Sequence, residues 1–313
     1  MRYNELNINA IMTRKSTLLC AFLITCTSFI NAQKEIECKT KLSLFHESVK
    51  AKKYDAAYDN WSFVKENCPD FNIAIYSDGE KILKHKIKNT TGEKKLMALE
   101  DLIILWKARS QYFPKRTPNG EYAAKACQLQ YDNRKLFEKN KEKLYSCFNN
   151  AFKADSKTFT HPKSLYSYFS LMVDLFDEGK KTDAELFNTY DDITEKIQDE
   201  IQNYSEKLNP LLEKQEREEL LNKKEKKNKS VYESYLKNYA LIQTNIDAKL
   251  SVRAVCDNLI PLYTKEFEIY KTDAIWLKRA VSRMYHKECT EDLLYETLVK
   301  QYDMVDPSAD TKV

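Results

Sequence analysis

Glycine and proline are scarce in this sequence: 313 residues contain only four glycines and seven prolines. These two residues supply many of the tight turns in proteins, and their scarcity favours long helices with few such turns. Lysine, glutamate, aspartate, leucine, asparagine and tyrosine dominate instead, and several of these are good helix formers. The composition therefore predicts an all-α protein.

The sequence also lacks the short motifs of several enzyme classes. It has no glycine-rich phosphate loop, no Gly-x-Ser-x-Gly elbow and no His-Glu-x-x-His pair. Its histidines, His46, His85, His161 and His286, are scattered. His286 and Cys289 have a spacing suited to two metal ligands, but no second pair accompanies them, and a disulfide for Cys289 is the favoured alternative. We expect no catalytic residue, no metal site and no cofactor, and hence not an enzyme.

Neither sign of charge predominates, with 51 lysines and arginines against 47 aspartates and glutamates. Because the two signs are interspersed, the formal net charge of +4 gives no support for nucleic-acid binding. The adjacent carboxylates Asp191-Asp192 and Asp199-Glu200 fall on a predicted helix, where neighbouring side chains diverge. We interpret both pairs as parts of a solvated helix face.

Long apolar runs are absent except near the start of the sequence. Residues 18–30 (LLCAFLITCTSFI) follow Arg14 and Lys15 and precede Ala32. A positive flank, a short apolar core and a small residue indicate a secretory signal over residues 1–32, cleaved after Ala32. The run is short for a membrane span of ~20 residues. We expect an exported protein, periplasmic or secreted, with no membrane span in the mature chain.

Two alternatives to a free exported chain remain. Cys26 lies in a Leu-Ile-Thr-Cys stretch that resembles a lipidation site, although Thr25 is larger than the residue usual before a lipid-bearing cysteine. The second alternative is that the apolar segment is not cleaved and remains as a membrane anchor.

Six cysteines follow the signal, an even count that suggests disulfides in an exported chain. Cys38 begins one predicted helix and Cys68 ends its antiparallel partner, so both lie at the same end of that hairpin, and Cys256 and Cys289 stand in the same relation. Cys127 and Cys147 lie about equally far from the turn between their helices. The predicted bonds are Cys38–Cys68, Cys127–Cys147 and Cys256–Cys289. The alternative is six free buried thiols.

Residues 53–70 (KYDAAYDNWSFVKENCPD) have the periodicity of one buried helix face followed by a proline stop. Tyr54, Ala57 and Trp61 are spaced three and four residues apart, and Pro69 comes at +12 from the alanine. This pattern resembles the second helix of a tetratricopeptide repeat. The alternative is an ordinary amphipathic hairpin in a bundle without repeats.

A second unit of this kind lies near the end of the sequence, with Trp276, Ala280 and the closing Pro307. Together with the stretches KKYDAAYDNW, HPKSLYSYFSLMVDLF, ELFNTYDDI and WLKRAVSRMYHKEC, these residues resemble exported tetratricopeptide-like proteins of Bacteroidota. The resemblance implies an irregular α-solenoid of helical hairpins and an interaction protein outside the cytoplasm. It implies no catalytic residues.

Residues 182–250 differ from a plain repeat array. Apolar residues recur there at spacings of three and four, close to a heptad seam, at Leu186, Tyr190, Ile193, Ile197, Ile201, Tyr204 and Leu208. Pro210 interrupts the seam, and the Lys-rich run 223–229 (KKEKKNK) marks a solvated turn or, alternatively, a contact with an anionic surface. This pattern predicts a long antiparallel coiled-coil-like hairpin.

Three capping boxes, Ser or Thr followed three residues later by Glu, mark predicted helix starts. They are Thr90 with Glu93, Thr182 with Glu185, and Ser230 with Glu233. We also expect a helix over residues 72–89 that Gly79 weakens in its middle.

The predicted organisation has four parts. They are a signal peptide (1–32), N-terminal tetratricopeptide-repeat-like (TPR-like) repeats (33–181), the long hairpin (182–250) and C-terminal TPR-like repeats (251–313). The function that we expect is a non-catalytic extracytoplasmic scaffold for a protein partner that the sequence does not identify. The alternatives are a glycan or small-ligand binding protein or enzyme on a helical fold, and self-association through residues 182–250.

Overall fold

The structure is a computed structural model that describes residues 33–307, and the predicted signal segment with Cys26 and Ala32 lies outside them. Every regular element between residues 33 and 307 is a helix, which confirms the all-α prediction. None of these helices has both the length and the apolar character that a membrane crossing needs. A tetratricopeptide arrangement remains a prediction.

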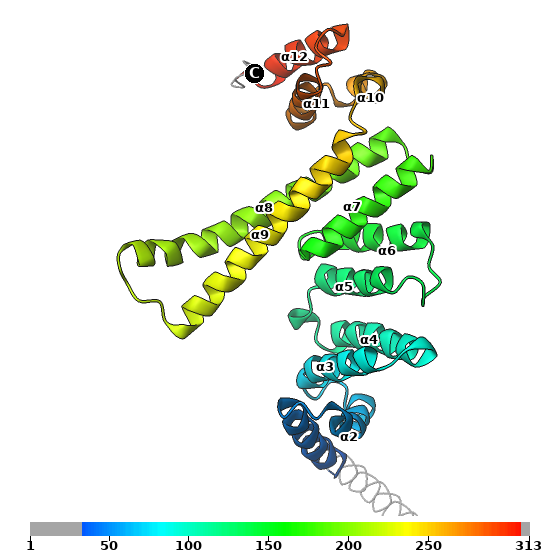
Figure 1. The fold of residues 1–313 in the computed structure, drawn as a ribbon, viewed down its shortest axis with the longest axis vertical. Coiled ribbons are helices and arrows are strands. Elements are labelled where there is room, and N and C mark those ends of the chain that lie inside the picture. Colours follow the sequence, from blue (N-terminus) through cyan, green and yellow to red (C-terminus); the bar gives the residue numbers. More distant parts are fainter. Residues whose placement is uncertain (1–32, 308–313) are drawn as a thin grey trace, which may run out of the picture. The chain divides into compact units, whose positions relative to one another are not determined.

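The chain forms two compact units that divide after Pro118 (Figure 1). The predicted organisation has no division there and instead separates residues 33–181 from the long hairpin. The difference has a physical reason: α7 packs against α6 on one side and against α8 and α9 on another. Residues that looked like repeats therefore share a core with the hairpin.

The first unit consists of a helix through residues 33–50, α2 (Tyr54–Asn67), α3 (Ala74–Asn89), α4 (Gly92–Tyr112) and the 3-10 turn η1 (Pro114–Arg116). Its core is built around Trp61, which is 1% exposed. The indole nitrogen of Trp61 donates a hydrogen bond to the Ile75 carbonyl oxygen at 2.7 Å. Gly79 lies against the same ring, where a Cβ atom would meet the indole nitrogen at 2.4 Å. Gly79 therefore provides room for the tryptophan.

The start of α4 differs from the predicted capping box. Thr90 donates its hydroxyl to the Lys86 carbonyl oxygen at 2.7 Å and so closes the end of α3. The helix α4 begins at Gly92 after Thr91, which makes no side-chain cap. The predicted Thr90–Glu93 box is wrong because Thr90 serves the preceding helix.

The second unit contains eight helices among the residues described. They are α5 (Asn119–Asp132), α6 (Lys141–Ala154), α7 (Pro162–Asp177), α8 (Asp183–Glu216), α9 (Lys223–Ser251), α10 (Cys256–Tyr270), α11 (Ala274–His286) and α12 (Leu293–Val305). One hydrophobic cluster joins them, from Ala124 to Tyr302. Its centre is α7, in which 11 of 16 residues are buried.

The longest helices, α8 and α9, pack along each other as a hairpin (Figure 1). The Thr182–Glu185 capping box starts α8 as predicted. Asn222 and Glu225 form the box that starts α9, so the prediction of a start at Ser230 is wrong and residues 223–229 are helical. Pro210 lies inside α8 without ending it. Coiled-coil packing of the hairpin remains a prediction.

Three disulfides close helical pairs in the structure. The bonds are Cys38–Cys68 in the first unit, and Cys127–Cys147 and Cys256–Cys289 in the second. These are the pairs expected from hairpin geometry. The first and third bonds lie near helix ends, whereas Cys127–Cys147 joins the middle of α5 to the middle of α6.

Candidate functional site

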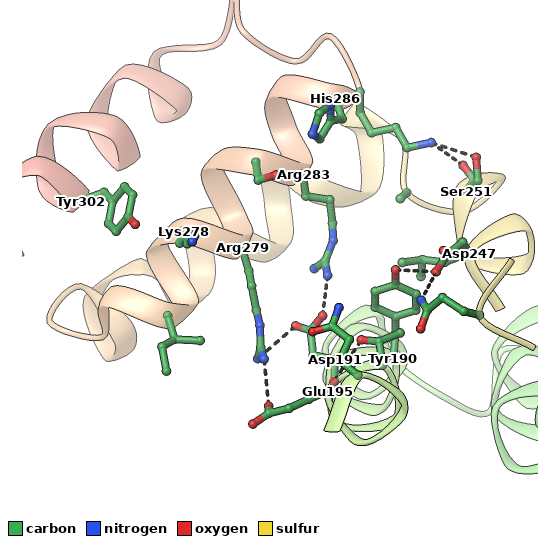
Figure 2. Close-up of a pocket in the computed structure, with 18 of the residues that line it drawn as sticks. Tyr190, Asp191, Glu195, Asp247, Ser251, Lys278, Arg279, Arg283, His286 and Tyr302 are labelled. Carbon is green, nitrogen blue, oxygen red and sulfur yellow. Dashed lines mark hydrogen bonds and ion pairs between the residues drawn. The ribbon is translucent and has the colours of Figure 1, made fainter. Parts of the chain in front are cut away.

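A cleft of about 760 Å³ lies in the second unit, among α8, α9, α11 and α12 (Figure 2). Charged or titratable side chains line much of it: Asp191, Glu195, Asp247, Lys278, Arg279, Arg283, His286, Lys287 and Asp306. The two long helices supply most of the carboxylates, and α11 supplies the cations. The cleft thus has an acidic wall and a basic wall.

Two arginines of α11 form ion pairs with carboxylates of the acidic wall. Arg283 donates to Asp191 at 2.6 Å, and Arg279 donates to Glu195 at 3.0 Å. Figure 2 shows Arg279 reaching both carboxylates, with its second nitrogen 3.8 Å from Asp191. Only 15% of the Asp191 side chain is exposed, so the predicted solvated face is wrong for this residue.

Arg283 is the most enclosed cation of the cleft. Its guanidinium lies 4.9 Å from the Phe187 ring centre and 5.5 Å from that of Tyr190, and it donates to the Tyr263 hydroxyl at 2.9 Å. Burial opposes its charge, but Tyr263 and Asp191 outweigh burial and raise the pKa of Arg283 above its ordinary value. This arginine therefore stays charged and ties α11 to α8 and α10.

Asp247 of α9 is held by neutral donors. The Tyr190 hydroxyl donates to it at 2.8 Å and the Gln243 amide at 2.7 Å. Burial, followed by the hydrogen bond to Asp247, raises the pKa of Tyr190, so its hydroxyl remains a donor. The Gln243 carbonyl oxygen is buried and has no hydrogen-bond partner among the described residues. This part of the wall retains hydrogen-bonding capacity.

The basic wall presents a line of polar side chains along α11. Lys278, Ser282 and His286 are four residues apart and all line the cleft (Figure 2 labels the first and last). Lys287 donates to both the carbonyl and the hydroxyl oxygen of Ser251 at 3.0 Å. Within residues 33–307, Lys278 forms no ion pair, so its charge faces the open cleft, and the His286 ring lines the cleft beside it.

Asp192 points away from the cleft, as adjacent side chains on a helix do. It lines a smaller hollow with Phe152 and Asp199. Burial raises the pKa of Asp192 above its ordinary value, and the charges of Asp191 and Glu195 raise it further.

A second groove of about 760 Å³ lies between the start of α7 and the outer face of α9. Serines, asparagines and apolar residues make up most of its lining, with Lys163 and His161 at one side. Burial lowers the pKa of His161, which favours its neutral form. The first cleft, with its concentration of paired and unpaired charges, is therefore the candidate site.

The repeat-signature residues do not belong to this cleft. Tyr54, Ala57, Trp61 and Pro69 lie in the first unit, Trp276, Ala280 and Pro307 lie in the second, and none of the seven lines the cleft. Ala57, Trp61 and Ala280 are buried in helix packing. The sequence did contain one signal for the cleft: the cations of α11 repeat at a spacing of four.

The predicted absence of a metal site remains a prediction, although His286 does not pair with Cys289, whose sulfur is disulfide-bonded. In the part of the chain that the structure describes, no three His, Cys, Asp or Glu side chains gather as metal ligands would. Asp191 and Glu195 are engaged by arginines and Asp247 by neutral donors, an arrangement suited to fixed electrostatics.

No protein-family model matches this sequence, and no curated protein matches it. The geometry and charge of the cleft therefore carry the functional conclusion.

Proposed function

We propose that this protein is a non-catalytic interaction scaffold outside the cytoplasm, and that the cleft holds a segment of a protein partner. One observation carries the proposal: Asp191 and Glu195 are neutralised by Arg279 and Arg283, whereas Lys278 remains unpaired within the described chain. Carboxylates fixed by arginine are poorly suited to exchange protons with a substrate. An unpaired lysine beside them attracts an acidic segment.

Three disulfides support the proposed location. Disulfides persist in oxidising compartments and are rare in the cytosol. Intact mass spectrometry of the native protein, with and without reduction, tests this part. We expect a chain beginning after Ala32 and a gain of six hydrogens on reduction; a chain that begins at Cys26 and carries a lipid would contradict free export.

The binding role is tested by reversing one unpaired charge. Lys278→Glu should reduce copurification of the partner from a native envelope extract by about tenfold, since it replaces attraction by repulsion. The matched control is Lys265→Glu, because Lys265 is exposed on α10 and lies outside the cleft lining. Equal partner recovery with both variants, or no partner specific to the wild type, would contradict the proposal.

A second candidate is a glycan or small-ligand binding protein. The cleft volume falls within the ~300–1,000 Å³ typical of ligand sites, and Tyr190 and Tyr302 line it beside carboxylates. A thermal-shift titration with chitooligosaccharides and maltooligosaccharides tests this alternative. A saturable increase in melting temperature that Ser282→Trp abolishes would favour it over the scaffold.

A further inference from the structure

The outer end of the α8–α9 hairpin consists of residues 213–229, which we call the tip. It carries acidic side chains on one edge and basic side chains on the other. The end of α8 and the turn after it contain Glu213, Glu216, Glu218 and Glu219, and the start of α9 contains Lys223, Lys224, Lys226 and Lys227. Figure 1 shows the tip turning away from the other helices of its unit. Accordingly, the core cluster of this unit includes no residue between 205 and 234.

These charges have the wrong sign for their helix ends. The C-terminus of a helix favours cations and the N-terminus favours anions, because the backbone dipoles align along the axis. Here α8 ends in glutamates and α9 begins in lysines. Apart from the Asn222–Glu225 capping box, these charges therefore do not stabilise the helix ends on which they lie.

The two residues with the favoured sign pair with each other instead. Lys214 lies 2.6 Å from Glu225 across the hairpin, which satisfies both. Arg217 forms an ion pair with Glu219 at 2.8 Å. Lys229 pairs with Glu233 at 3.2 Å. The other three glutamates and four lysines of the tip form no ion pair or side-chain hydrogen bond with any residue described. They are available to another molecule.

An exposed leucine marks the turn between the acidic and basic edges. Leu220 is 94% exposed, whereas the neighbouring Leu221 is 6% exposed and packs within the hairpin. A large apolar side chain surrounded by unpaired charges is typical of the centre of a small interface with a charged rim.

We propose that the tip binds the tip of a second copy of this chain. A twofold axis through the turn would set each acidic edge against the partner's basic edge, and a twofold interface repeats every such contact. The same axis would bring the two Leu220 side chains together and remove them from water. Because each tip has both an acidic and a basic edge, a second copy supplies all the complementary charges and no other partner is needed.

Two charge variants test this proposal. In the first, Lys223, Lys224, Lys226 and Lys227 are each replaced by Glu; in the second, Glu213, Glu216 and Glu218 are each replaced by Lys. Either variant alone should lose the dimer that the wild type forms at low ionic strength in sedimentation velocity, because the unpaired charges of its tip then all have one sign. An equimolar mixture should recover a heterodimer, since one tip is acidic and the other basic.

The design separates association from folding. Both variants place the favoured sign at a helix end, so their melting temperatures should not fall below that of the wild type. Leu220→Ser should weaken the wild-type dimer by about tenfold without changing its salt dependence. A wild type that stays monomeric at high concentration and low ionic strength would overturn the proposal, as would homodimers of either charge variant or a mixture that remains monomeric.

Discussion

At the scale of single residues, Arg283 has the densest set of contacts in the cleft. It joins α11 to Asp191 of α8 and Tyr263 of α10, and 13% of its side chain is exposed. Removing one partner of an enclosed ion pair leaves the other charge without compensation.

We expect Arg283→Met to lower the free energy of unfolding by about 2–4 kcal/mol, because Asp191 then keeps only a longer contact with Arg279. Urea unfolding followed by circular dichroism measures the loss. Arg279→Met is the control: its side chain is 37% exposed, and it should cost less than about 1 kcal/mol. Equal losses in the two variants would contradict this role for Arg283.

Gly79 is a second residue whose replacement has a defined physical cost. Its Cβ position overlaps the Trp61 indole, a large and fully packed ring. We expect Gly79→Ala to destabilise the first unit by about 1–3 kcal/mol through overpacking, although alanine favours helices. Ser77→Ala, at an exposed position of the same helix, should stay within about 0.5 kcal/mol of the wild type. A stabilised Gly79→Ala variant would show that the ring moves at little cost.

The ion pairs of Glu178 make the stability of the fold depend on pH in the acid range. Hydrogen bonds from Lys141 and then Lys180 lower its pKa from the ordinary 4.5 to about 2. Since the unfolded chain lacks these partners, the contribution to stability is complete above about pH 4.5 and is lost as the pH falls toward 2.

Glu178→Gln should therefore melt below the wild type at neutral pH and converge with it near pH 2, as followed by thermal circular dichroism. The difference should shrink in high salt because these side chains are exposed to solvent. Glu291→Gln, at an exposed site without an ion pair among the residues described, should not alter the profile. A gap between the Glu178 variant and the wild type that stays constant across this pH range would contradict the assignment.

At the scale of helices, the Cys256–Cys289 bond fixes the start of α10 near the end of α11. The same end of α11 carries His286 and leads into Lys287. Cys256→Ser with Cys289→Ser should cost about 2–4 kcal/mol and weaken partner binding in the cleft, measured by thermal melting and copurification. Replacing Cys38 and Cys68 in the first unit should leave binding unchanged. Normal binding in the variant that lacks Cys256–Cys289 would contradict a role of this disulfide in the site.

Helix positions could be predicted from the sequence more readily than their starts. Apolar spacing of three and four located α7 and α8 because a buried stripe is encoded locally. The Ser230–Glu233 box failed because Asn222 and Glu225 form an equivalent box two turns earlier. Local motifs of similar energy compete, and hairpin packing decides between them.

At the scale of the whole chain, neither the division after Pro118 nor the cleft could be predicted from local patterns. Whether residues 119–181 form one unit with the long hairpin depends on which neighbours α7 packs against. The cleft depends on Asp191, Asp247 and Arg283 meeting from three helices that are far apart in sequence. The sequence pattern assigns Asp191 to a solvated helix face, whereas tertiary packing places it opposite Arg283.

The central claim is that the cleft binds a segment of a protein partner. A photo-crosslinking amino acid at Ser282, inside the cleft, tests it against the same group at Tyr285, which is exposed on α11 outside the lining. We expect one discrete crosslinked partner from position 282, absent from position 285 and lost when Lys278→Glu is added. Identical crosslinks from both positions, or crosslinks that survive Lys278→Glu, would contradict it.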